Sequence, residues 1–261
     1  MRFFRATRKR GFQGALPSEE PLLYPYGSSE WLLDLSPVVV FAPHPDDETF
    51  GCGGTLLRMS RKGAEITLVA VTDGRKGAHG SEIDTNTYVK TRRREFDRVA
   101  DALGARSVWW GFGDRETSRF FEEIGRKAKS LVSQIKPALV FLPSPWEIHP
   151  DHRVVTEAVL SVLQGEALKV VFYEGIVALR PNLVVDISGV AQEKMELMKI
   201  YSSQIDVLPY HTAMEGLNRL RALTVSNSTS AEAFVVLSVA GAKDLLKMVR
   251  ETEALLLPAR P

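Results

Sequence analysis

Short, continuous apolar runs alternate with helix-type segments along this chain, and the alternation limits the folds it can adopt. The runs have the length of strands and little polar alternation, which is typical of strands buried on both faces. They lie at residues 38–42, 66–72, 107–112, 138–143, 170–175, 183–187 and 231–237. Apolar stripes at helical spacing fall between most of them, and a closing helix is expected at the end. These stripes occupy residues 96–103, 120–135, 154–163 and 241–257. The pattern predicts a doubly wound α/β fold with a mostly parallel sheet.

Length and composition fit one globular domain behind an arm. The chain has 261 residues, of which 44% are hydrophobic, enough to build a core without disulfides. Residues 1–36 contain several prolines and glycines with little periodicity, so we expect an N-terminal arm or cover segment there. A single domain is then expected over residues 37–261. The basic residues of MRFFRATRKR are interpreted as a solvated part of the arm.

Charge and cysteine content favour a cytoplasmic protein. The formal net charge of +1 gives no overall attraction to nucleic acid or to an acidic membrane. No apolar run approaches the length of a membrane span, and none follows the N-terminal basic residues as it would in a secretory signal. The single cysteine, Cys52, excludes an intrachain disulfide. The oligomeric state is left open, and a homo-oligomer is compatible with the sequence.

Ionisable residues gather where four of the predicted strands end. PHPDDE (43–48), TDGRKG (72–77), GFGDRE (111–116) and PSPWEIHPDHR (143–153) each follow one apolar run. In open α/β sheets, ligands bind outside the carboxyl ends of the strands. We therefore expect these four segments to share one site.

Two of these segments have the spacing of metal ligands. His44 and Asp47 are three residues apart, as are His149 and His152, and such pairs share a face if each tetrapeptide begins a helix. A proline stands second in each tetrapeptide, which suits a helix N-terminus. His44, Asp47 and His152 could then hold one divalent ion with an open position, as in catalytic zinc sites. Each turn alone would also suit a capped helix start; the presence of both favours the metal site.

Two residues of the same turns remain for catalysis. Asp46 is placed to act as general base toward a metal-bound water, whose pKa zinc lowers to about 7. His149 is expected to act as an imidazolium that stabilises an oxyanion or protonates a leaving amine. The same ligand set serves non-haem Fe(II) enzymes, so zinc and iron both remain open.

The residues after the first turn are small. Gly51, Gly53 and Gly54 lack Cβ atoms and would let a helix approach the sheet closely. Cys52 is interpreted as a small buried filler rather than a ligand or nucleophile. No phosphate-binding glycine pattern stands there.

Together these residues resemble the LmbE/PIG-L family of metal-dependent de-N-acetylases. The most specific motifs are A-P-H-P-D-D-E at 42–48 and H-P-D-H at 149–152. Weaker matches extend the resemblance over most of the chain, as far as residue 205. They are TDG (72–74), Arg92 with Glu95, Ala100, Leu103 and Gly104, GFGD (111–114), FYE (172–174), VDIS (185–188), and Lys194 with Gln204.

The resemblance implies a Rossmann-like three-layer α/β/α domain with the metal site at the carboxyl ends of the strands. It implies zinc-dependent hydrolysis of an N-acetyl group on an N-acetylglucosamine-type amino sugar. By position, His44, Asp47 and His152 match the metal ligands, Asp46 the general base, and His149 the acid or oxyanion-stabilising residue.

Three further residues are carried over or left open by the resemblance. Arg92 and Asp114 match positions that contact substrate in some members of the family. Glu147 stands two residues before His149, where some members carry an aromatic group that assists catalysis. Whether Glu147 assists His149 is left open.

Two other functions are compatible with the motifs. One is a metal-assisted esterase or phosphoesterase; phosphoesterases often use two metal ions, for which this sequence offers few extra carboxylates. The other is a non-catalytic sugar-binding module with a structural metal. Residues 79–90 and 206–218 are expected to shape the pocket, and the identity of the substrate stays open.

Overall fold

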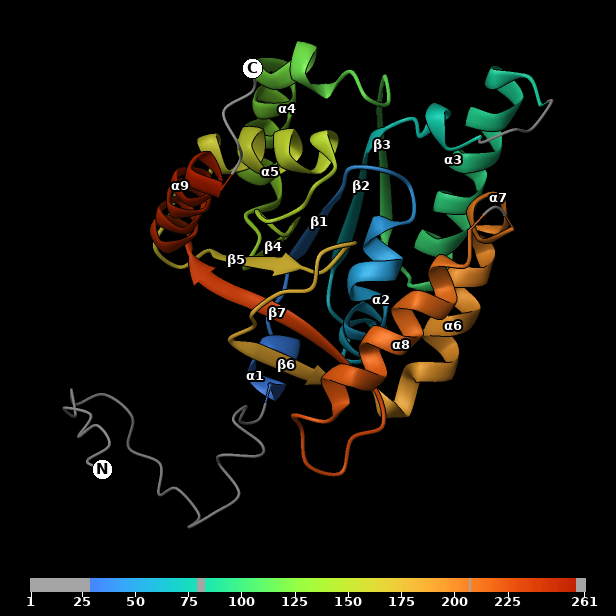
Figure 1. The fold of residues 1–261 in the computed structure, drawn as a ribbon, viewed down its shortest axis with the longest axis vertical. Coiled ribbons are helices and arrows are strands. Elements are labelled where there is room, and N and C mark those ends of the chain that lie inside the picture. Colours follow the sequence, from blue (N-terminus) through green and yellow to red (C-terminus); the bar gives the residue numbers. More distant parts are fainter. Residues whose placement is uncertain (1–28, 79–82, 207, 257–261) are drawn as a thin grey trace.

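The computed structural model describes residues 29–78, 83–206 and 208–256 (Figure 1). Most of the predicted arm, residues 1–28, lies outside this range. Its last part is included: helix α1 (Glu30–Leu33) packs on α2 (Asp47–Arg61), and Leu32 and Leu33 are buried in the main core. The division of the chain into arm and domain stays a prediction.

Within the described residues, seven strands form one sheet. They are β1 (Val38–Ala42), β2 (Ile66–Thr72), β3 (Arg106–Phe112), β4 (Leu139–Pro143), β5 (Lys169–Tyr173), β6 (Leu183–Asp186) and β7 (Ala231–Ser238). Their order across the sheet is β3-β2-β1-β4-β5-β7-β6. Strands β1 to β5 pair with one another in parallel, whereas β7 runs antiparallel to both β5 and β6. The strand order therefore reverses between β1 and β4, where such sheets bind ligands.

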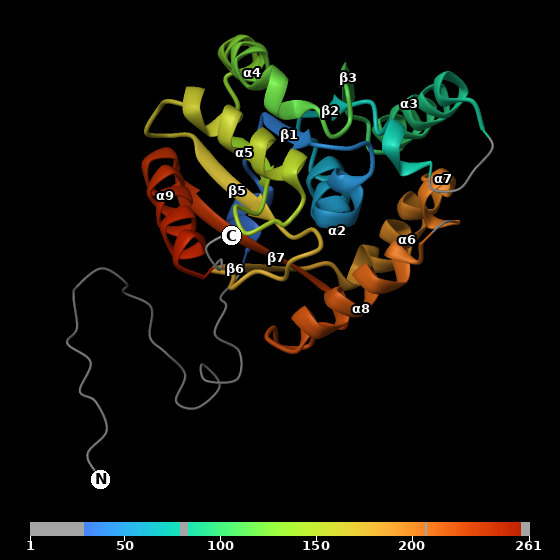
Figure 2. The same ribbon diagram turned by 45° about the horizontal axis from the view of Figure 1, so that its top comes forward.

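Helices cover both faces of the sheet (Figures 1 and 2). One face carries α2, α3 (Thr85–Ala102), α6 (Ala191–Ile200) and α8 (Tyr210–Ala222), with the short α7 (Ser202–Ile205) beside them. The other carries α4 (Phe121–Ile135), α5 (Pro150–Val162) and α9 (Val239–Leu256). Short 3₁₀ turns are η2 (Arg75–Gly77), η3 (Thr117–Phe120) and η4 (Ser188–Val190). No helix in the described part of the chain is long and apolar enough to cross a membrane.

The predicted fold class is confirmed, and the prediction was most accurate for the central strands. The strands at 38–42 and 66–72 have the predicted bounds. The segment after β6 is more regular than expected, because α6 and α8 were not predicted and together they cover the outer side of α2.

Helix α2 is two helical segments joined at a kink, where Cys52 has a non-helical φ of −145°. The interruption leaves the backbone N–H groups of Gly54 and Thr55 available, and both donate to the Glu232 carboxylate at 2.8 and 2.7 Å. An anion at a helix N-terminus satisfies unpaired donors and suits the helix dipole. Glu232 on β7 therefore caps the second segment, while Nζ of Lys194 on α6 lies 2.7 Å from Oε1 of Glu232, the oxygen that also accepts from Gly54.

Two glycines of α2 are required by close approach to the sheet, as the sequence predicted. A Cβ at Gly51 would lie 2.3 Å from Cδ2 of Tyr173, and one at Gly54 would lie 2.7 Å from Cδ1 of Ile187. Gly53 is less constrained, since its Cβ would meet Cγ2 of Thr49 at 3.4 Å. The absence of side chains brings α2 close to β5 and the β6 end, with the preceding turn at the centre of the sheet edge.

Candidate metal centre and pocket

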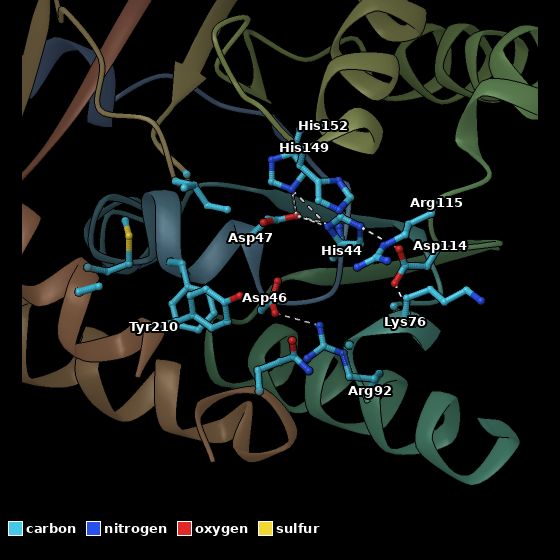
Figure 3. Close-up of a pocket in the computed structure, with 18 of the residues that line it drawn as sticks. His44, Asp46, Asp47, Lys76, Arg92, Asp114, Arg115, His149, His152 and Tyr210 are labelled. Carbon is cyan, nitrogen blue, oxygen red and sulfur yellow. Dashed lines mark hydrogen bonds and ion pairs between the residues drawn. The ribbon is translucent and has the colours of Figure 1, made fainter. Parts of the chain in front are cut away.

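The turns that follow β1 and β4 bring three ligand-type atoms together (Figure 3). Nδ1 of His44 lies 3.4 Å from Oδ2 of Asp47, and Nε2 of His152 lies 3.2 Å from each of these atoms. A tetrahedral zinc ion with bonds of about 2.0–2.1 Å has ligand atoms about 3.3 Å apart. The residues predicted as ligands therefore have the donor chemistry and the mutual spacing that fit one such ion.

The first turn differs from the predicted helix start. Helix α2 begins only at Asp47, and its N-cap residue Asp46 has φ of 141°, so Pro45 precedes the helix. The backbone N–H of His44 donates to Oδ2 of Asp47 at 2.8 Å and closes the turn. His44 and Asp47 thus meet across a turn rather than on a helix face. A non-glycine residue at such a φ stores on the order of 1–3 kcal/mol of strain.

The second turn begins a helix as predicted. His149 is the N-cap of α5 and Pro150 is its first residue. Nδ1 of His149 accepts from the backbone N–H of Asp151 at 3.2 Å, so a neutral ring carries its proton on Nε2. Burial, with the neighbouring His44 and His152, lowers the pKa of His149 to about 4. This environment favours the neutral imidazole over the imidazolium that was expected.

Two carboxylates hold the far side of the His44 ring. Its Nε2 lies 3.2 Å from Oδ2 of Asp151 and 3.5 Å from Oδ1 of Asp114. The backbone N–H groups of Arg115 and Lys76 donate to these carboxylates at 2.7 and 2.9 Å and fix them. Burial lowers the pKa of His44, but the carboxylates of Asp114, Asp151 and Asp47 together raise it well above its usual value.

Asp151 was missed by the sequence analysis, although it stands inside the H-P-D-H motif. Its position between two histidines assigned to the site was the available signal, but only the fold shows that it reaches His44 from β4's side of the sheet edge. An acceptor on Nε2 leaves Nδ1 of His44 directed at the other two ligand atoms.

Arg92 holds the predicted base. Its Nη2 donates to Oδ2 of Asp46 at 2.9 Å and to the backbone oxygen of Pro45. Burial raises the pKa of Asp46 to about 6, against the opposing effect of the Arg92 cation. A carboxylate that titrates near neutral pH suits general-base chemistry. Arg92 also lines the pocket, but its closest partners are Asp46 and Pro45 rather than open space.

A pocket of about 520 Å³ opens over these residues, and Asp114 lies in its wall. One side is cationic, with Lys76 and Arg115; the other is apolar and formed largely by α8. The apolar lining residues are Phe50, Ile176, Ala178, Tyr210, Ala213, Met214 and Leu217. The expectation for residues 206–218 is therefore confirmed. Of the segment 79–90, residues 79–82 lie outside the described range and none of residues 83–90 lines the pocket.

Two overlapping groups of ligand-type side chains occur among the described residues. His149 joins His44 and His152 in one, and His44, Asp114, His149 and Asp151 form the other. In the second group, Asp114 and Asp151 already accept hydrogen bonds from backbone N–H groups and face the His44 ring. Asp47 belongs to neither group, although its Oδ2 lies 3.4 and 3.2 Å from ring nitrogens of His44 and His152, so the His44–Asp47–His152 triangle stays a prediction as the primary metal site.

Comparisons with known proteins find similarity to de-N-acetylases. Residues 39–163 match the family model described as PIG-L: GlcNAc-PI de-N-acetylase. The chain is 29% identical over 193 residues to the diacetylchitobiose deacetylase of Thermococcus kodakarensis, covering 66% of this chain and 71% of that protein. It is 27% identical over 188 residues to the probable N-acetyl-alpha-D-glucosaminyl L-malate deacetylase 2 of Bacillus cereus, covering 66% and 84% of the two chains.

A solved structure shares the fold over most of its length. The N,N'-diacetylchitobiose deacetylase from Pyrococcus horikoshii superposes with a TM-score of 0.72, covering 88% of this chain and 96% of that one. At 23% identity this likeness concerns the fold alone.

Proposed function

We propose that this protein, whose residues 39–163 match the PIG-L family model, is a metal-dependent hydrolase that removes the N-acetyl group from an amino-sugar conjugate. The conjugate is of the N-acetylglucosamine type. The triangle of His44, Asp47 and His152 beside the buried Asp46 carries the proposal. The names of the relatives from Thermococcus kodakarensis and Bacillus cereus support the substrate class.

His44, Asp47 and His152 would hold one divalent ion, and their mixed imidazole and carboxylate set suits zinc or iron(II). When bound, that ion supplies a Lewis acid next to the acetamide carbonyl and lowers the pKa of water. The pocket of about 520 Å³ has room for a sugar ring and part of its substituent.

Asp46 accepts the proton of the attacking water in this proposal. Its carboxylate is kept available by the Arg92 cation, while burial holds its pKa at about 6 and makes it a stronger base than an exposed aspartate. The same carboxyl then delivers the proton to the departing amine nitrogen as the C–N bond breaks. The products are acetate and a free amine.

His149 stabilises the oxyanion of the tetrahedral intermediate. Because Nδ1 accepts from the Asp151 backbone, the Nε2–H of a neutral ring is free to donate to a developing negative charge. Asp114 is proposed to accept from a sugar hydroxyl at the pocket wall. Arg92 stays a proposed substrate contact in addition to its role in holding Asp46.

An acetate-release assay over a panel of N-acetylglucosamine conjugates tests the proposal, with zinc or iron present and a chelated control. We expect metal-dependent release, one ion per chain, and loss of turnover in a metal-loaded Asp46→Asn variant. Wild-type turnover in that variant contradicts the assignment of the base. Two tightly bound ions per chain favour a phosphoesterase, and tight sugar binding without release favours a binding module.

A further inference from the structure

Glu147 is a buried carboxylate that the proposed reaction does not use. It lies in the loop between β4 and α5 and is 0% exposed. Two other buried carboxylates have cationic partners: Glu232 pairs with Lys194, and Glu174 with Arg221. Among the described residues, Glu147 instead lies next to a histidine, His152.

The contact joins two atoms that lack hydrogen bonds. Oε2 of Glu147 and Nδ1 of His152 lie 3.6 Å apart, slightly beyond hydrogen-bond distance. Both are fully buried, and neither has any other hydrogen-bond partner among the described residues. A buried acceptor and a buried ring nitrogen that face each other in this way are costly unless a proton is shared between them.

The opposite nitrogen of the same ring explains the pairing. Nε2 of His152 belongs to the ligand triangle. An imidazole that gives its Nε2 lone pair to a cation carries its proton on Nδ1, and that N–H requires an acceptor. Oε2 of Glu147 is the buried acceptor in position to receive it.

The other oxygen of Glu147 is tied to the pocket wall. Oε1 accepts from the backbone N–H of Val177 at 3.2 Å, and a Cβ at Gly175 would lie 2.7 Å from it. Gly175 and Ile176 line the pocket. One carboxylate therefore contacts both a candidate metal ligand and the loop that borders the substrate pocket.

From this geometry we propose that Glu147 is the positioning residue for His152. It receives the Nδ1–H, fixes the tautomer and directs Nε2 at the metal. Glu147 thus serves His152 and not His149, the partner considered from the sequence alone. The inference concerns metal binding and stands whether or not the proposed deacetylation is the reaction.

The main test is the affinity of Glu147→Gln for Zn²⁺ and Co²⁺, measured by competition with a chromophoric chelator. A glutamine amide has one acceptor and one donor end, so it must direct an NH₂ group at either Val177 N–H or His152 Nδ1–H. We expect affinity to fall by about 10- to 100-fold, with an altered visible spectrum of bound Co²⁺. Glu174→Gln, which removes a neighbouring buried carboxylate that pairs with Arg221, is the matched control and should leave metal affinity unchanged.

A second variant disturbs the position of Glu147 without replacing this residue. Gly175→Ala places a methyl group against Oε1 and should displace the carboxylate, weakening metal binding in the same direction. Circular dichroism of each variant establishes that it is folded. The proposal is overturned if Glu147→Gln and Gly175→Ala both bind Zn²⁺ and Co²⁺ as tightly as the wild type, or if Glu174→Gln loses the same affinity.

Discussion

Nη2 of Arg92 lies 2.9 Å from Oδ2 of Asp46, and both side chains are buried beneath the pocket. A cation at this distance favours the ionised carboxylate and opposes the effect of burial on its pKa. Replacing Arg92 by Met should therefore raise the pKa of Asp46 above its present value of about 6. We expect the acidic limb of the kcat/KM profile to move to higher pH by about one to three units.

The matched control is Arg93→Met, the exposed neighbour on α3, whose profile should coincide with that of the wild type. An Arg92→Met enzyme with an unmoved acidic limb would show that Asp46 is not the group whose ionisation limits the rate.

The backbone at Asp46 predicts a difference between two substitutions that both remove the carboxylate. Its φ of 141° strains an alanine but not a glycine. In metal-free protein, Asp46→Gly should be more stable than Asp46→Ala by about 1 kcal/mol or more, as measured by urea unfolding. Equal midpoints for the two variants would mean that the turn relaxes and stores no strain.

Replacing each glycine of α2 by alanine should change the stability of the protein by different amounts. Gly51→Ala and Gly54→Ala introduce atoms at 2.3 and 2.7 Å from Tyr173 and Ile187, so both should lower the free energy of unfolding by about 1–3 kcal/mol. Gly53→Ala makes only ordinary contact and gains helix propensity, so it should be neutral or slightly stabilising. Thermal melts of the three variants test this order, and a loss at Gly53 as large as that at Gly51 contradicts it.

Lys194 and Glu232 form a buried pair that joins α6 and β7 to the second segment of α2. Lys194 also donates to the backbone oxygen of Phe50 and to Asn218 at 2.9 and 2.8 Å. Lys194→Met leaves the Glu232 carboxylate buried without a cation and should cost about 3–5 kcal/mol of stability. Lys199→Met, on the same helix but in an exposed pair with Glu196, should leave the unfolding midpoint nearly unchanged. Similar losses in the two variants would argue against a special role for burial.

Cys52 should be chemically inert in the folded protein. Burial raises the pKa of its thiol well above the usual value, and Sγ donates to the backbone oxygen of Glu48 at 3.1 Å. Since the thiolate is the reactive form, iodoacetamide should label Cys52 fully in guanidinium chloride and only slowly in buffer. Mass spectrometry follows the label; rapid labelling of native protein would indicate that α2 opens at its kink.

The sequence predicted β1 and β2 accurately because every residue of these two strands is buried, so each strand reads as a nearly continuous apolar run. The sequence also predicted that His44 and His152 lie at the same edge of the sheet, because both residues follow strands whose carboxyl ends meet there. The conformation of Asp46 could not be predicted in this way. Proline followed by two aspartates favours a helix start locally, whereas the closed turn depends on side-chain contacts made in the folded site.

Contacts between residues far apart in the sequence could not be predicted from the sequence. Glu232 stands in an apolar run where a carboxylate has no evident reason to be, and its reason is the kink in α2 and Lys194. Likewise, the roles of Glu147, in the loop before α5, and Asp151, in the first turn of α5, are visible only once these residues lie beside His152 and His44. In each case the type of residue indicated a possible chemical role. Which residue it contacts depends on how the fold brings distant segments of the chain together.

The pairing of β1 with β4 has a consequence for the stage of synthesis at which the candidate metal site is completed. Val38 pairs with Leu139, and the two halves of the ligand triangle follow these two strands. During synthesis, a ribosome-bound chain that has exposed only β1, β2 and β3 offers His44 and Asp47 but not His152. If these three residues hold the ion as proposed, the complete ligand set forms only after α5 has emerged, so a newly made chain would gain its metal after the centre of the sheet has formed.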